Sequence, residues 1–205
     1  MTLTTNARHR RRADTTGGAA GNERLTAMTG AVLLVLFAAE GVTILRVHQL
    51  LTVHFFVGML LIGPVALKAA STGYRFVRYY SGTWPYVRKG PPASLMRLLG
   101  PLLIATSLAV LGTGVALAVV GPGDRQWLFL HKASFVLWFG VMTIHVLVYA
   151  PRLPRLLLSG QATGRTIAVL GGRGTRWLLL AASLACGLVL AAATLHLTTR
   201  WGATG

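Results

Sequence analysis

Long apolar blocks separated by short polar segments form the pattern of this chain. Five blocks are long enough to cross a bilayer, which takes about 20 residues of helix; they run roughly over Leu25–Leu45, Leu51–Ser71, Leu98–Val120, Trp127–Tyr149 and Trp177–Leu197. A segment in lipid must pair its own backbone polar groups, so blocks of this length predict α-helices. The sequence therefore predicts an all-α integral membrane bundle, with five transmembrane helices in one domain over residues 25–200.

Polar residues, glycine and proline mark the connections between the blocks. Residues 46–49 and 121–125 predict two short turns at one membrane face. The longest predicted loop covers residues 73–97 at the other face, where the two prolines at 91–92 stop a helix. Residues 1–24 are small, polar and basic, and we expect them to form a disordered tail.

The distribution of charge indicates a membrane orientation. A net charge of +16 on a soluble protein would suggest nucleic acid as a partner. Here 15 of the 20 lysines and arginines precede the first block or follow the second and fourth, four lie on the opposite side, and Lys68 lies inside a block. By the positive-inside rule we expect a multi-pass plasma-membrane protein, with a cytoplasmic N-terminus and an extracytoplasmic C-terminus. The expected partner is the lipid bilayer, with no nucleic acid.

Two blocks carry polar groups at the same spacing. The second contains His54 and Lys68, and the fourth contains His131 and His145, each pair separated by fourteen positions. Fourteen residues of α-helix advance about 21 Å through nearly four turns, so each pair lies on one stripe of its helix. Two such stripes facing each other predict room for one or two haem groups.

His54 and His131 are the first candidate site. They lie at matching depth on helices predicted to be parallel, and two neutral imidazoles at one depth suit axial ligation of a single haem iron. The alternative is a histidine pair that only cross-links helices, worth about 1 kcal/mol. His48 and His196 are expected to be interfacial, and His9 falls in the predicted tail.

A second haem near the cytoplasmic face would need His145 and the residue at position 68. A lysine must lose its proton to bind iron, and near a membrane face it can extend to water instead. We therefore expect Lys68 to mark a lost or altered inner site. Glu40, the one acid within a block, is expected to be protonated, or paired with Arg46 or a histidine.

Other residues in the blocks add less chemistry. Trp138 lies midway between His131 and His145 on nearly the same helical face, where it would pack in the bundle or contact a haem edge. The single cysteine, Cys186, excludes a disulfide framework and a thiolate metal cluster. The second and fourth blocks also share glycines at matching positions, Gly63 and Gly140, a faint internal repeat.

With these paired stripes, residues 25–150 resemble the four-helix haem-binding core of b-type cytochrome membrane subunits, including ferric-reductase-like ones. In that family two helices carry two histidines each, about thirteen residues apart, and His54, His131 and His145 match three of the four. Lys68 departs from the pattern, and the fifth helix lies outside the resemblance. The resemblance implies haem b, and electron transfer between a quinol or flavin donor and an extracytoplasmic acceptor, as in a membrane oxidoreductase. The partner that it implies is a quinol or a redox partner subunit.

Three functions remain open from the sequence. The first is a membrane cytochrome with at least one bis-histidine haem near the outer face. The second is a cofactor-free scaffold or assembly subunit whose histidines only hold helices together. The third is a small proton-coupled carrier that uses Glu40, Lys68 and His145 as titrating groups.

Overall fold

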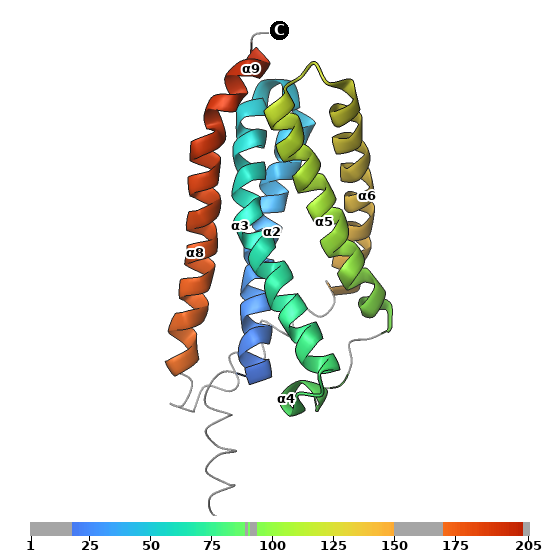
Figure 1. Ribbon diagram of the computed structural model, residues 1–205, viewed down its shortest axis with the longest axis vertical. Helices are drawn as coiled ribbons and strands as arrows, with labels where there is room; N and C mark the ends of the chain where they lie inside the picture. The colour runs from blue at the N-terminus through green and yellow to red at the C-terminus, as the bar shows by residue number, and fades with distance from the viewer. Residues whose placement is uncertain (1–17, 89, 91–93, 150–169, 203–205) are drawn as a thin grey trace, which may run out of the picture.

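The computed structural model describes residues 18–88, 90, 94–149 and 170–202, and all regular structure in these ranges is helical. Five long helices run alternately up and down the molecule (Figure 1). They are α2 (Gly18–Leu45), α3 (Val47–Tyr80), α5 (Ser94–Val120), α6 (Arg125–Tyr149) and α8 (Leu170–Thr194); α4 (Trp84–Val87), the 3₁₀ helix η3 (Leu195–Thr198) and α9 (Thr199–Gly202) are short. The predicted all-α bundle is confirmed.

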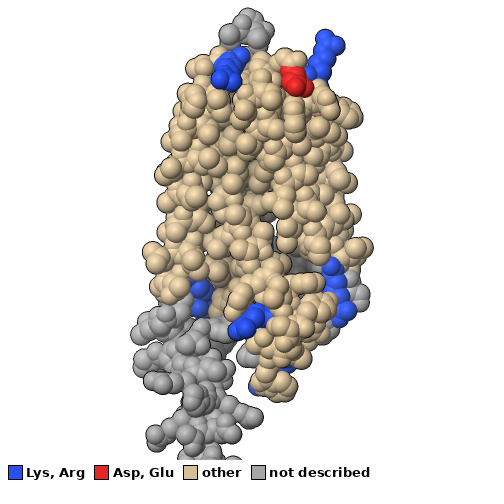
Figure 2. Space-filling model, viewed as in Figure 1, with Lys and Arg blue, Asp and Glu red and all other residues tan. Residues whose placement is uncertain are grey.

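All five long helices contain a stretch long and apolar enough to cross a membrane. We name the two ends of the bundle by residues: the Arg46 end, where α2 meets α3, and the Tyr80 end, where α3 finishes. Figure 2 shows Lys and Arg side chains at both ends and a broad belt without charge between them. The chain is therefore a multi-pass membrane protein.

Two helices extend further at the Tyr80 end than the apolar blocks predict. Helix α2 begins at Gly18, so the prediction of a disordered tail is wrong for residues 18–24, and residues 1–17 lie outside the described part. The extension is held by a contact between helices, because Asn22 Nδ2 donates a hydrogen bond to the Ser71 carbonyl, at 2.9 Å. The apolar pattern carries no signal for such a polar contact.

The predicted loop 73–97 is also wrong over much of its length. Helix α3 has 34 residues, about 51 Å of helix, which exceeds the roughly 30 Å of hydrocarbon in a bilayer. Its last turns therefore continue beyond the apolar block, and the chain turns only at Gly82, whose φ of 75° favours glycine. Helix α4 follows at once, and α5 begins at Ser94.

The helices form two groups. Helix α3 packs along α2 on one side and along α8 on another, whereas α6 packs along α5. Helices α3 and α5 join the groups, and α6 makes at most slight backbone contact with α2 and α3 (Figure 1). The fifth spanning helix, α8, is thus no peripheral addition to a four-helix core, because its interface with α3 is the most extensive one in the part of the chain that the structure describes.

Candidate functional site at the interface of α3 and α6

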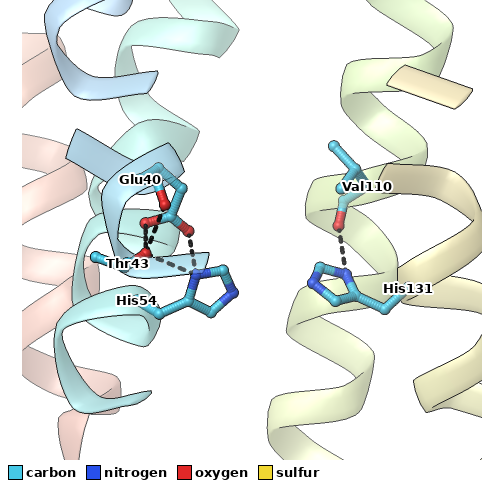
Figure 3. Close-up of polar contacts among 5 residues, drawn as sticks. All are labelled: Glu40, Thr43, His54, Val110 and His131. Carbon is cyan, nitrogen blue, oxygen red and sulfur yellow. Dashed lines mark hydrogen bonds and ion pairs between the residues drawn. The ribbon is translucent and has the colours of Figure 1, made fainter. Parts of the chain in front are cut away.

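His54 of α3 and His131 of α6 face each other near the Arg46 end of the bundle (Figure 3). Their ring centroids are 6.4 Å apart, and the ring planes are inclined at 69°. The two residues therefore lie at the same level of the bundle. They face each other between α3 and α6, whose backbones make at most slight contact.

The His54 ring is held by two side chains of α2. Glu40 Oε1 lies 2.9 Å from His54 Nδ1, and the Thr43 hydroxyl lies 3.0 Å from the same nitrogen. Thr43 also donates to the Glu40 backbone carbonyl at 2.6 Å, and its hydroxyl lies 3.2 Å from Glu40 Oε2. The sequence predicted Arg46 or a histidine as a partner of Glu40, and the structure pairs it with His54.

The His131 ring is held by α5. Its Nδ1 lies 3.2 Å from the Val110 carbonyl oxygen and 3.3 Å from the Thr113 hydroxyl. A carbonyl oxygen only accepts hydrogen bonds, so the contact with Val110 requires the proton on Nδ1. Gly114 provides the space, since a Cβ at that position would lie 3.0 Å from His131 Cε1.

The two Nε2 atoms point toward each other across the interface in Figure 3. In a neutral imidazole with its proton on Nδ1, Nε2 keeps a lone pair that can bind a metal. The pair therefore offers two nitrogen donors to one atom placed between them. Among the described residues, no group of three or more His, Cys, Asp or Glu side chains gathers as a metal ion held by protein alone would need.

An aromatic pair lies about two helical turns from His131, toward the middle of the bundle. The Phe37 ring of α2 packs against Trp138 of α6, with centroids 4.7 Å apart. Trp138 is buried, and its indole N–H donates to the Ser107 hydroxyl of α5 at 3.0 Å. Of the two predicted roles for Trp138, packing in the bundle is the one that these contacts describe.

Lys68 of α3 and His145 of α6 lie nearer the Tyr80 end of the bundle. The Lys68 ammonium donates to the Thr26 carbonyl of α2 at 2.5 Å, and Gly30 provides the space for it. The same part of the α2–α3 interface holds a hydrogen bond between Thr26 and Ser71, so Lys68 belongs to a polar contact between two helices.

The remaining histidines lie away from this interface. His48 is exposed at the turn between α2 and α3, and His196 is exposed in η3, where its Nδ1 contacts the Ala193 carbonyl at 2.9 Å. His9 lies outside the described residues. The structure thus brings together His54 with His131, and leaves His48 and His196 apart from that pair.

Three partners of the histidines were missed by the sequence reasoning: Thr43, Thr113 and the Val110 carbonyl. Thr43 follows Glu40 by three positions, which places both on one face of a helix. That spacing of two polar residues inside an apolar block was a usable signal. Nothing in the sequence marks the Val110 carbonyl, because every residue of a helix has a backbone carbonyl, whatever its side chain.

Comparison with models of protein families, with curated proteins and with solved structures finds no match to this chain.

Proposed function

We propose that this protein is a membrane electron carrier that holds one haem b between His54 and His131. When bound, the haem supplies reversible one-electron chemistry at its iron. The protein supplies the two axial imidazoles, their orientation and an apolar surrounding. The observation that carries the proposal is the facing pair of Nε2 atoms, with the ring centroids 6.4 Å apart.

The spacing of the rings supports axial ligation. A metal–imidazole bond is about 2.0 Å long and the ring centre lies about 1.1 Å behind Nε2, so imidazoles on opposite sides of one metal have centres about 6.2 Å apart. The observed separation of 6.4 Å is close to this value. The described contacts of both Nδ1 atoms go to α2 and α5, so neither Nδ1 atom is used in a bond between the two rings.

The hydrogen bonds at Nδ1 also support this function. A metal-binding histidine almost always donates its other ring N–H to a carboxylate, a carbonyl or water, which fixes the tautomer and the ring orientation. His54 has the Glu40 carboxylate, and His131 has the Val110 carbonyl. Because a porphyrin supplies the four remaining nitrogen ligands, two histidines are enough.

We propose one haem for each chain. At the level where a second would lie, position 68 is a lysine whose ammonium is bonded to the Thr26 carbonyl. An ammonium has no lone pair to offer iron. The charge asymmetry of the sequence favours a plasma-membrane orientation with the haem near the outer face. A quinol or a redox subunit on the cytoplasmic side would then be the electron donor.

The test is a reduced-minus-oxidised visible spectrum of protein purified from haem-replete cells. We expect a b-type band that disappears in His54→Ala and in His131→Ala. His48→Ala and His196→Ala are the matched controls, since both side chains are exposed and away from the pair, and both variants should keep the band.

The cofactor-free alternative has one observation in its favour. The ion pair of Glu40 with His54 links α2 to α3 without any metal. If linking the helices were the whole role of His54, the purified protein would be colourless. His131→Ala would then leave the pairing of Glu40 with His54 and the contact between α2 and α3 unchanged.

A further inference from the structure

The two histidines of the site differ in the group that accepts their Nδ1 proton. His54 faces the carboxylate of Glu40 at 2.9 Å, whereas His131 faces the neutral carbonyl of Val110 at 3.2 Å. A hydroxyl contacts each ring, Thr43 at His54 and Thr113 at His131, so the hydroxyls do not account for the difference. The asymmetry comes from one negative charge.

The partly buried surroundings strengthen the hydrogen bond between the Glu40 carboxylate and the His54 ring. The side chain of Glu40 is 13% exposed and that of His54 is 22% exposed, while Thr43 is 4% exposed. Hydrogen bonds to an ionised group are shorter and stronger than neutral ones, and low local polarity strengthens them further. No lysine or arginine side chain is paired with Glu40 in the described contacts.

A carboxylate that accepts the Nδ1 proton draws that proton toward itself and makes Nε2 a stronger electron donor. A stronger donor favours the oxidised, more positive iron over the reduced one. A neutral carbonyl has a smaller effect of the same kind. The two axial imidazoles are therefore unequal, and the one on α3 is the more basic.

We propose that Glu40, held in place by Thr43, sets the reduction potential of the site through His54. Glu40 is a positioning residue, because it acts on the iron only through the imidazole. This inference rests on the proposed haem function and adds to it the residue that tunes the cofactor. It also explains why a carboxyl group occurs in an otherwise apolar stretch of α2.

The experiment compares the haem midpoint potentials of the wild type, Glu40→Gln and two controls. Asp124→Asn removes a carboxylate that caps the start of α6 near the same end, where Oδ1 accepts from the Gln126 and Trp127 backbone N–H groups. Thr194→Val removes a hydroxyl of α8 that bonds to the Leu190 carbonyl of its own helix. The ferric electron paramagnetic resonance spectrum is recorded for each protein to show that two imidazoles still bind.

We expect Glu40→Gln to keep the bis-imidazole signal, with shifted g values. Its midpoint potential should rise by about 59 mV, which is a tenfold increase in the ratio of ferrous to ferric haem for one electron. The two controls should stay near the wild type. If Glu40→Gln purifies without haem, Thr43→Val takes its place, with a smaller rise expected because the carboxylate remains but is no longer held in place against the His54 ring.

The outcomes separate this inference from the proposed function. Haem bound in Glu40→Gln at an unchanged potential would overturn the role of Glu40 and leave the cytochrome proposal standing. An equal rise in Asp124→Asn would also overturn it, because the effect would then be one of net charge alone. A wild-type protein that binds no haem would overturn both.

Discussion

Gly63 of α3 lies directly against the Ser183 carbonyl of α8: a Cβ placed on Gly63 would come within 2.0 Å of that oxygen. The contact is reciprocal, since a Cβ on Gly187 would lie 2.2 Å from the Leu60 carbonyl of α3. Small residues that let two backbones approach are a main source of helix association in lipid. These two glycines explain why the fifth spanning helix docks on α3.

Gly63→Ala should destabilise the protein. The added methyl group has no space unless one helix moves, and overpacking of this kind costs about 1–3 kcal/mol. Thermal unfolding of the protein in detergent, followed by circular dichroism, measures the change. Gly140→Ala is the matched control, since nothing lies within 4 Å of a Cβ at that position of α6. Equal stability of the two variants would contradict the close contact of α3 with α8.

Lys68→Met and His145→Ala should both leave the haem content of the purified protein unchanged. The two residues lie fourteen positions along their helices from the proposed ligands, about 21 Å away. The haem-to-protein ratio, measured as the pyridine haemochrome, should be one in both variants. A loss of about half of the haem in His145→Ala would mean that a second haem binds near the Tyr80 end.

Ser107→Ala should cost about 1–3 kcal/mol in unfolding free energy, because it leaves the buried Trp138 indole N–H without its acceptor. Thr143→Ala is the control, since its hydroxyl bonds only to the Phe139 carbonyl on an exposed face of α6. That change should stay within about 0.5 kcal/mol of the wild type. Thermal unfolding of the two variants side by side makes the comparison.

The five spans could be predicted from the sequence because length and hydropathy decide whether a segment enters lipid. The depth of the histidine pair followed from helical geometry, since His54 and His131 begin two stripes of the same length. The ends of α2 and α3 could not be predicted in the same way. Their last turns leave the lipid, where polar residues such as Asn22 are held by contacts with another helix.

The sequence also did not predict which helices pack against one another. In lipid, helix–helix and helix–lipid surfaces are equally apolar, so hydropathy does not tell them apart. Gly63 and Gly140 occupy matching positions in the faint internal repeat, yet one touches a neighbouring backbone and the other faces open space. Lys68 likewise gave no sign that its partner would be the Thr26 carbonyl.

Rescue of the ligand-free variants by imidazole is the most direct measurement of the central claim. His54→Gly and His131→Gly each leave a hole the size of one imidazole beside the proposed iron position, and His48→Gly is the control at an exposed position. We predict that the b-type band of the first two variants is lost and returns when imidazole is added, while His48→Gly never loses it. A band that survives both substitutions, or a wild-type protein without one, would contradict axial ligation by these two histidines.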